Sequence, residues 1–356
     1  MLYDKWMKSD AEDMWRASLE EALGDDLKDH SVVYVENIEG SYKWSTEAVD
    51  GVKEAYGDPD NILRHVDGVE VVLSGYAPFT GKMMRASRNL KLIGISRGGP
   101  VNVDQKAATE LGVIVLRAVG RNAVSVADQT MGFILSESRN IARHHHALRS
   151  GTYFKDTSGG GRQEYMDSFQ WMELEGKTLG LIGYGQVGAR VAKRALAFDM
   201  RVVVYDPYVD EATLITDSCV KTSLETLLRG SDFVSIHAML TPETRHMINE
   251  ETLRLMKPSS VLVNTARGGI VDEPALYRAL KEHRIYGAAL DVFEEDPIKP
   301  GNPLLGLDSL TVTPHSAGRS PEVEVRGIRQ VAQQAACFLR GDPVDPVYIS
   351  NKDVLG

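Results

Sequence analysis

The chain has 356 residues, which exceeds one ordinary domain and predicts two. Its formal net charge of −10, without any run rich in Lys and Arg, argues against non-specific binding of nucleic acid. Two cysteines in so long a chain are typical of reduced intracellular thiols, and the polar N-terminus and lack of an apolar stretch of roughly 18 residues predict a cytoplasmic protein rather than a secreted or membrane-spanning one.

The first third of the chain alternates apolar runs with segments of helical period. This alternation is typical of a parallel sheet with crossover helices. Only Met1–Tyr3 precedes the first helical pattern, so we expect a short first strand. We expect the further strands at 32–35, 69–74, 90–95 and 113–115, and helices at about 11–22, 60–65 and 81–87.

The middle and last parts of the chain continue the same alternation after one long helical pattern at 122–149. Beyond residue 175 we expect strands at 179–182, 202–205, 233–237, 261–264, 287–290 and 310–312. We expect the intervening helices at about 187–198, 223–228, 250–256 and 273–282, and a last helix at 321–339.

A glycine-rich turn joins the first two strands of this second set. The segment LGLIGYGQVGARVAKRALAFDMRVVVYDP places Gly183, Gly185 and Gly188 in G-x-G-x-x-G spacing between a strand and a helix. This spacing lets a pyrophosphate approach the backbone at the helix N-terminus. Asp206 closes the next strand, where a carboxylate accepts from ribose hydroxyls and repels a 2′-phosphate. The segment therefore predicts an NAD site, with NAD preferred over NADP.

The position of this turn in mid-chain predicts the domain layout. We expect an α/β protein with two doubly wound parallel-sheet domains. A Rossmann NAD-binding domain at 120–319 would be inserted into a flavodoxin-like substrate-binding domain made of 1–119 and 320–356. The active site is expected in the cleft outside the carboxyl ends of the strands.

Three further segments carry residues suited to hydride transfer on a 2-keto acid, each at the end of a strand. Arg267 precedes two glycines, and its planar fork suits a carboxylate, although a salt bridge to a neighbouring helix is an equal alternative. Asp291 closes an apolar strand and is followed by the acid run Glu294–Asp296. His315 suits acid–base chemistry, although alone it is better explained as a packed polar residue.

Taken together, the segments NTARGGIVDEPAL, GAALDVFEEDP and TPHSAG resemble the signatures of the D-isomer-specific 2-hydroxyacid dehydrogenase family, in family order. The resemblance is of the phosphoglycerate dehydrogenase-like kind and covers nearly the whole chain. It implies a catalytic triad of Arg267, Asp296 and His315. The family usually has Glu where this chain has Asp296, so Glu295 is the alternative partner of the histidine.

The same resemblance implies contacts with the cofactor and the substrate. The implied cofactor contacts beyond the glycines and Asp206 are Gln186, Val187, Ala238, Thr265, Ala266 and Asp291. It also places the substrate carboxylate on the loop that carries Arg97, Gly98 and Gly99, where many members lack the arginine. Tyr76, in a turn after a strand, adds a hydroxyl donor.

Several arginines lie in segments that the family places around the cleft, namely Arg97, Arg121 and Arg319 in addition to Arg267. Cations in a water-poor cleft are costly without an anion, so they suggest a longer polar acid, either a sugar acid or a phosphorylated acid such as phosphoglycerate. The equal alternative is that some of them pair with Glu or Asp or point to solvent.

The sequence therefore predicts an NAD-dependent D-2-hydroxyacid dehydrogenase. The resemblance implies a homodimer formed through 122–149. We expect no metal, because consecutive histidines 144–146 on a helix point in different directions and fit a solvated face. The alternative is an NAD(H)-sensing regulatory protein of the same fold, as in the C-terminal-binding protein corepressors. The intact Arg, acid and His argue against it, because binding alone does not need them.

Overall fold

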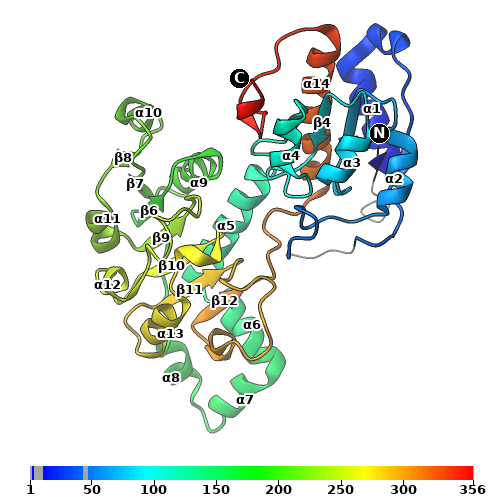
Figure 1. The fold of residues 1–356 in the computed structure, drawn as a ribbon. Helices are drawn as coiled ribbons and strands as arrows, with labels where there is room; N and C mark the ends of the chain where they lie inside the picture. Colours follow the sequence, from blue (N-terminus) through cyan, green and yellow to red (C-terminus); the bar gives the residue numbers. More distant parts are fainter. Residues whose placement is uncertain (1, 4–10, 43–46, 356) are drawn as a thin grey trace. The chain divides into compact units, whose positions relative to one another are not determined.

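The computed structural model describes residues 2–3, 11–42 and 47–355 (Figure 1). The chain splits into two compact units. The outer unit comprises Met1–Arg121 and Ser320–Gly356, and the inserted unit comprises Asn122–Arg319. Each unit has a parallel sheet flanked by helices, which confirms the predicted fold class.

The sheet of the outer unit has five strands in the order β2-β1-β3-β4-β5, all parallel. This is the flavodoxin-like order. The strands are β1 (Leu2–Tyr3), β2 (Val35–Glu36), β3 (Val71–Ser74), β4 (Leu92–Ile95) and β5 (Ile114–Arg117). The helices are α1 (Ala11–Leu23), α2 (Pro59–Val66), α3 (Gly81–Ala86), α4 (Gln105–Glu110) and α14 (Pro321–Arg340).

The two faces of this sheet bury different layers because successive residues of a strand point to opposite sides. Leu92 packs with Trp15 of α1 and Val331 of α14. Its neighbour Ile93 packs with Ile62 of α2 and Met83 of α3. Helix α14, near the end of the chain, therefore packs into the same core as the first 121 residues.

The sheet of the inserted unit has seven parallel strands in the order β12-β11-β10-β9-β6-β7-β8. Counted from its own first strand the order is 3-2-1-4-5-6-7, which extends the Rossmann order by one strand. The strands are β6 (Thr178–Ile182), β7 (Arg201–Tyr205), β8 (Val220–Lys221), β9 (Phe233–Ile236), β10 (Val261–Asn264), β11 (Gly287–Leu290) and β12 (Leu310–Val312). The predicted bounds of β10, β11 and β12 are confirmed.

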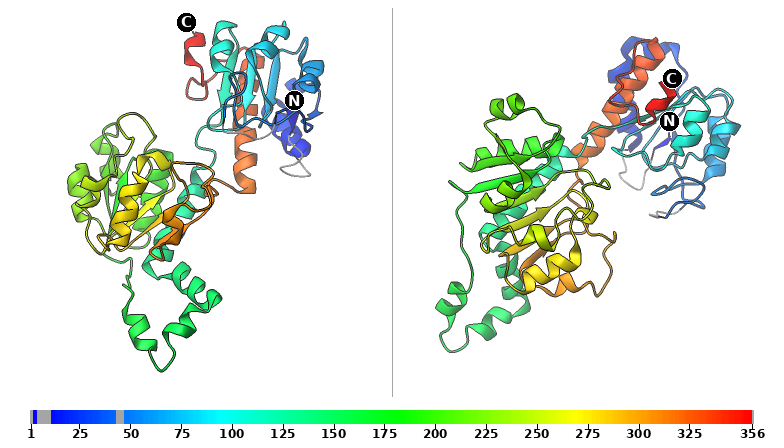
Figure 2. Two further views of the ribbon diagram at one scale, coloured as in Figure 1. Left: turned by 60° about the horizontal axis from the view of Figure 1, so that its bottom comes forward. Right: turned by 60° about the vertical axis from the view of Figure 1, so that its left-hand side comes forward.

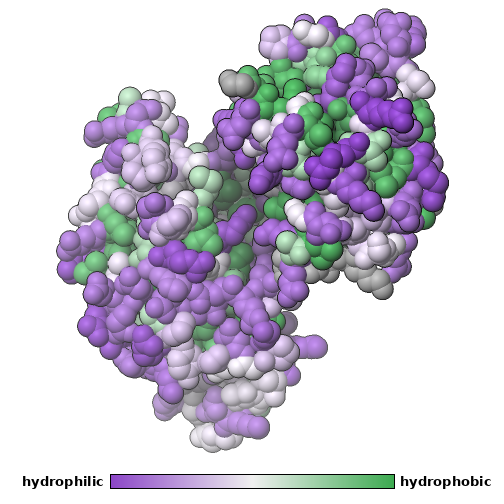
Figure 3. Space-filling model, in the orientation of Figure 1, coloured by the Kyte–Doolittle hydropathy of each residue, from purple (hydrophilic) through white to green (hydrophobic). Residues whose placement is uncertain are grey.

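Helices cover both faces of this second sheet (Figure 2). One layer holds α5 (Ala123–Ser138) and α9 (Gln186–Leu196), and the other holds α11 (Leu224–Gly230), α12 (Glu250–Leu253) and α13 (Glu273–Lys281). The outer surface of α12 and α13 is largely hydrophilic (Figure 3). There the Glu250 carboxylate pairs with Arg254, Arg278 and Arg284.

The long helix predicted at 122–149 is interrupted. Chain direction changes at Asn140, which has a φ of 54° and separates α5 from α6 (Ile141–Ser150). The Asn140 side chain donates to the Gln170 carbonyl at 2.8 Å and accepts from the Tyr286 hydroxyl at 2.6 Å. Asn tolerates left-handed backbone, and these tertiary contacts hold it there. Three short helices were not predicted: α7 (Thr152–Asp156), α8 (Arg162–Asp167) and α10 (Glu211–Thr216).

The expectation of a solvated face for all three consecutive histidines is wrong for His144. Its ring stacks on Trp171 at 5.1 Å between centroids, and burial lowers its pKa. His145 and His146 are exposed. Within the described ranges, no group of three or more His, Cys, Asp or Glu could hold a metal ion. No helix in those ranges is both long and apolar enough to cross a membrane.

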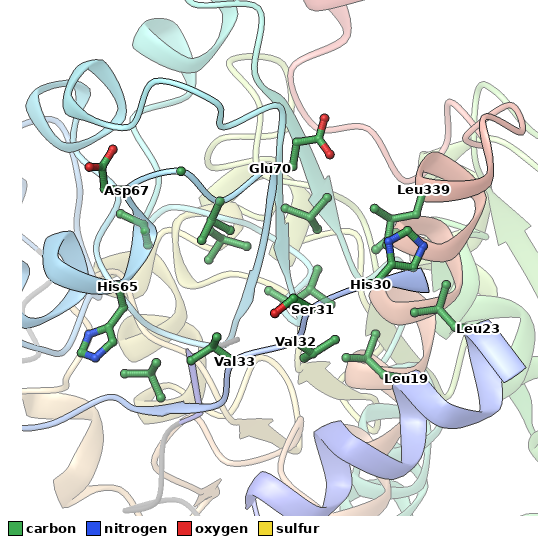
Figure 4. A pocket seen from close by; sticks show the side chains of 18 of the residues that line it. Leu19, Leu23, His30, Ser31, Val32, Val33, His65, Asp67, Glu70 and Leu339 are labelled. Carbon is green, nitrogen blue, oxygen red and sulfur yellow. The ribbon is translucent and has the colours of Figure 1, made fainter. Parts of the chain in front are cut away.

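The strand predicted at 32–35 is largely wrong, because only Val35 of that range enters β2. Its partner β1 pairs through Leu2 and Tyr3 with Val35 and Glu36. A cavity of about 430 Å³ lies there, between Val32 and Val33 on one side and β3 on the other, with Leu19 and Leu339 beside it (Figure 4). None of the predicted site residues lines this cavity. Four 3-10 turns complete the elements: Gly24–Asp29, Gly268–Ile270, Pro303–Gly306 and Lys352–Leu355.

Candidate active site

The predicted cofactor and catalytic residues of the inserted unit follow strands of one parallel sheet. Because the carboxyl ends of parallel strands lie at the same edge, these residues share that edge. In sheet order they are His315 after β12, Asp291 after β11, Arg267 after β10, Ala238 after β9, Gly183 after β6 and Asp206 after β7. The strand order reverses between β9 and β6, which is where a dinucleotide binds in such sheets.

The glycine-rich turn has the geometry that its spacing predicts. Gly183 has a φ of 97°, and a Cβ there would lie 2.7 Å from the Ala238 nitrogen. A Cβ on Gly188 would lie 2.4 Å from the Gly183 carbonyl oxygen. By contrast, a Cβ on Gly185 would meet open space, and no side chain caps the N-terminus of α9. The turn therefore leaves an open cradle of N–H groups that fits a diphosphate.

Asp206 is held in place by main-chain donors. One carboxylate oxygen accepts from the Tyr184 nitrogen at 2.7 Å, and the other accepts from Tyr208 and Val209 at 2.8 and 3.2 Å. These bonds orient a carboxylate at the end of β7 beside the glycine turn. Gln186, the first residue of α9, is exposed, and Val187 is half-buried.

The remaining implied cofactor residues differ in how accessible they are. Ala238 and Ala266 are half-buried. Thr265 is buried, and its hydroxyl bonds the Thr130 hydroxyl of α5 at 3.0 Å. Beneath the glycine turn, burial lowers the pKa of His237 to about 3, so this imidazole is neutral at physiological pH.

His315 and Asp296 are in direct contact. His315 Nδ1 pairs with Asp296 Oδ2, and both side chains are about half exposed. The two neighbouring acids have other partners, since Glu295 pairs with Lys299 and Glu294 pairs with His246. The geometry thus brings Asp296, and not Glu295, to the histidine.

Asp291 supports the histidine loop, a role that the sequence did not reveal. It is 1% exposed, and its oxygens accept from the main chain of Ser316 and Ala317 at 2.8 and 2.9 Å and from the Thr313 hydroxyl. Its carbonyl accepts from the His315 nitrogen at 2.8 Å. The only sequence signal was an acid at the end of a buried strand. Contact between Asp291 and a nicotinamide stays a prediction.

Arg267 is exposed, and no carboxylate of the described residues pairs with it. Its Nη1 donates to the Ala266 carbonyl at 2.6 Å. The next residue, Gly268, is buried against the acid-bearing loop: a Cβ there would lie 1.9 Å from the Phe293 carbonyl carbon. The Arg267 loop and the loop that carries Asp296 therefore pack backbone to backbone.

The predicted substrate residues other than Arg267 lie in the outer unit, after β3 and β4. Arg97 lies over the Tyr76 ring, 4.7 Å from its centroid, and pairs with Glu54. Burial raises the pKa of Tyr76, so its hydroxyl stays protonated. Gly98 and Gly99 are exposed, and among the described residues nothing accepts from their amide N–H groups.

The expected group of unpaired arginines is only partly present. Arg97 pairs with Glu54, and Arg121 pairs with Glu324 at 2.9 Å. Arg319 is exposed. The outer unit thus presents balanced pairs of charges, which is the alternative that the sequence left open.

Comparison with known proteins shows which family this chain is similar to. A sequence model described as "D-isomer specific 2-hydroxyacid dehydrogenase, NAD binding domain" matches residues 131–317. The D-3-phosphoglycerate dehydrogenase of Methanocaldococcus jannaschii is 41% identical over 280 residues, which are 78% of this chain and 51% of that protein. The hydroxypyruvate reductase of Thermotoga maritima is 39% identical over 272 residues, which are 76% of this chain and 84% of that protein.

A solved structure shows the same fold. The D-lactate dehydrogenase of Aquifex aeolicus, complexed with NAD and lactic acid, is 28% identical and superposes with a TM-score of 0.67 over 96% of each chain. The match to the phosphoglycerate dehydrogenase spans about half the length of that relative, whereas the match to the hydroxypyruvate reductase spans most of it.

Proposed function

The chain belongs to the D-isomer specific 2-hydroxyacid dehydrogenase family, and from this premise we propose that it uses NAD to interconvert a D-2-hydroxy acid and its 2-keto acid. The observation that carries the proposal is the contact of His315 Nδ1 with Asp296 Oδ2. This pair lies at the sheet edge that also carries the glycine turn and Arg267. A protein that only binds NAD has no need of a histidine oriented by a carboxylate.

In the proposed reaction, His315 is the general acid for reduction and the base for oxidation. Asp296 accepts from Nδ1, which leaves Nε2 to give a proton to the keto oxygen and stabilises the imidazolium of the reverse direction. The guanidinium of Arg267 binds the substrate carboxylate and polarises the carbonyl. Bound NADH supplies the hydride. Arg267 is exposed and has no carboxylate partner among the described residues, so it is available for an anionic ligand.

Residues of the outer unit support the proposed class of substrate. Gly98 and Gly99 offer two exposed N–H groups, which suit a carboxylate. Nearby, Arg97 with Glu54 and Arg121 with Glu324 supply both donors and acceptors without net positive charge. Two glutamates oppose a phosphate but accept bonds from hydroxyl groups. We therefore favour a hydroxylated acid, such as a sugar acid, over a phosphoglycerate-like substrate.

Oxidation of NADH with a panel of keto acids tests the proposal. The panel holds glyoxylate, hydroxypyruvate, phosphohydroxypyruvate and 2-keto sugar acids of four to six carbons. We expect turnover, with the highest kcat/KM for a keto sugar acid. Best turnover of the phosphorylated compound contradicts the substrate class alone. Tight NADH binding without turnover of any member favours the regulatory alternative and contradicts the activity.

We further propose a homodimer that forms through the α5–α6 region. The supporting observation is that two apolar side chains of α6, Ile141 and Leu148, are exposed, as is Phe154 of the following helix α7. Light scattering coupled to size exclusion tests it, and we expect Leu148→Glu to shift the mass toward one chain.

A further inference from the structure

His246 carries a side chain where the backbone favours glycine. Its φ is 50°, in the left-handed region that few non-glycine residues adopt, with Asn, Asp and His the most frequent among them. The imidazole Nε2 pairs with the Glu294 carboxylate, and both side chains are partly exposed. The side chain of His246 therefore makes one polar contact from an uncommon backbone conformation, and this contact joins two parts of the site.

On its main-chain side, His246 is joined to the loop that follows Arg267. The His246 nitrogen donates to the Gly269 carbonyl at 2.9 Å, and two residues later the Ile248 nitrogen donates to the Ile270 carbonyl at 3.0 Å. The segment therefore runs alongside the residues that follow Arg267 and is bonded to them.

On its side-chain side, His246 is joined to the loop that carries Asp296. Glu294 lies two residues before Asp296, and its main-chain nitrogen donates to a Glu273 carboxylate oxygen at 2.6 Å. Gly268 packs against this loop so closely that a Cβ would lie 2.4 Å from the Glu294 nitrogen. The pair His246–Glu294 therefore adds a side-chain contact between the loop that follows Arg267 and the loop that carries Asp296.

We propose that His246 and Glu294 form a positioning pair that sets the place of Asp296, and through it the orientation of the His315 ring. This inference rests on the proposed function of His315 as the general acid. Neither member of the pair needs to touch substrate or cofactor. Their contact fixes where the acid-bearing loop stands relative to Arg267.

The test replaces His246 with glycine, which suits the φ and removes only the imidazole. We expect His246→Gly to lower kcat about ten-fold, less than the 10²–10⁴ that a general acid itself contributes. The KM for NADH is expected to stay at the wild-type level, and the thermal midpoint is expected to stay at or above it, since backbone strain is relieved. His246→Asn, which tolerates the same backbone and keeps an uncharged donor, is expected to restore part of the rate.

The matched control is the neighbouring pair Glu295–Lys299 on the same loop. Glu295→Gln is expected to leave kcat unchanged, whereas Glu294→Gln is expected to reproduce the loss. In the double variant of His246 and Glu294, the loss is expected to equal that of either single variant. Unchanged kcat in His246→Gly, or equal losses for both acids, overturns the proposal. A loss that comes with a fall in the thermal midpoint and in NADH affinity marks a merely structural role and also overturns it.

A readout without turnover separates this inference from the proposed activity. Asp296 accepts from His315 Nδ1, so the neutral ring is biased toward the tautomer with hydrogen on that nitrogen. Nitrogen-15 NMR of the holoenzyme with NADH reports this tautomer directly. We expect the bias in the wild type and its loss in His246→Gly. If the ring is unaffected, the positioning role is wrong even where the enzyme turns over. If His246→Gly loses the tautomer bias but the wild-type protein reduces no keto acid, the positioning role holds and only the proposed activity is wrong.

Discussion

At the scale of single residues, we expect the Asp206 carboxylate to decide between the two nicotinamide cofactors. It is oriented by the main-chain nitrogens of Tyr184, Tyr208 and Val209, so it cannot easily turn away from a ribose phosphate. We expect a much higher kcat/KM with NADH than with NADPH. Asp206→Asn keeps an acceptor for the main chain and removes the charge, so the ratio is expected to fall. A ratio that stays at the wild-type value assigns the discrimination to other residues.

The catalytic pair yields a second prediction at this scale. His315→Ala is expected to lower turnover by about 10²–10⁴ while NADH still binds, because the imidazole acts on the substrate. Asp296→Asn is expected to cost far more than Glu295→Gln, since only Asp296 contacts the ring. Steady-state rates and NADH fluorescence titrations measure both quantities. Equal losses in the two acid variants contradict the assignment of Asp296.

The sequence predicted which residues belong to this site better than it predicted their contacts. Arg267 and His315 were suggested by strand-end position and by family resemblance, and the same resemblance indicated Asp296. The sequence alone could not show whether Asp296 or Glu295 contacts His315, because the side chains of adjacent residues point in different directions and only the structure shows which one faces the ring. The support from Asp291 to Ala317 joins the loops that follow β11 and β12, which are far apart in the sequence. Histidine is enriched in left-handed backbone, but most histidines adopt other conformations, so the residue type alone did not mark His246.

At the scale of elements, three strands of the inserted sheet were predicted with their observed bounds, whereas the predicted helix boundaries were less accurate. Strands β10, β11 and β12 are short apolar runs between turns, so their bounds are visible in the sequence. The end of α5 is not visible, because no proline or glycine marks it. It depends on Asn140 and its distant partners Gln170 and Tyr286. Tertiary contacts therefore override local pattern where the chain must turn.

A buried ion pair ties these same elements together and allows a stability prediction. Glu137 of α5 pairs with Arg143 of α6, with 1% and 8% of their side chains exposed, and Glu137 also accepts from Thr311 of β12. Arg143→Met leaves a buried carboxylate without its cation, which is expected to cost about 3–5 kcal/mol of unfolding free energy. Chemical denaturation measures it. A cost below about 1 kcal/mol, the range of a surface pair, contradicts the buried role.

The pH dependence of that variant has a defined sign. Burial raises the pKa of Glu137 above its ordinary value, and Arg143 opposes this shift. A carboxyl group whose pKa is raised by folding stabilises the folded state when protonated, and this contribution is lost as pH rises through the raised pKa. Without Arg143 the pKa rises further. We expect the Arg143→Met variant to gain stability as pH falls through the raised pKa of Glu137, and thermal unfolding at several pH values measures this.

At the scale of the whole molecule, the inserted unit is continuous in sequence and the outer unit is not. All seven strands of the inserted sheet and both of its helical layers lie within Asn122–Arg319. We therefore expect residues 122–319 expressed alone to unfold cooperatively and to bind NADH. Residues 1–121 alone are expected to fail, because α14 covers Leu92 and Leu116 in the outer core. Circular dichroism and NADH fluorescence measure this, and a stable 1–121 fragment contradicts it.

The late position of α14 also has a consequence during synthesis. When residues 1–121 have left the ribosome, about 200 residues must still be translated before α14 begins. At about 5–20 residues per second, this takes roughly 10–40 s. Throughout that interval, the nascent outer unit holds the Leu92 face of its sheet without its last helix, while the inserted unit can fold as soon as it emerges. The order of translation thus makes the first part of the chain the last to fold, and the part most in need of a chaperone.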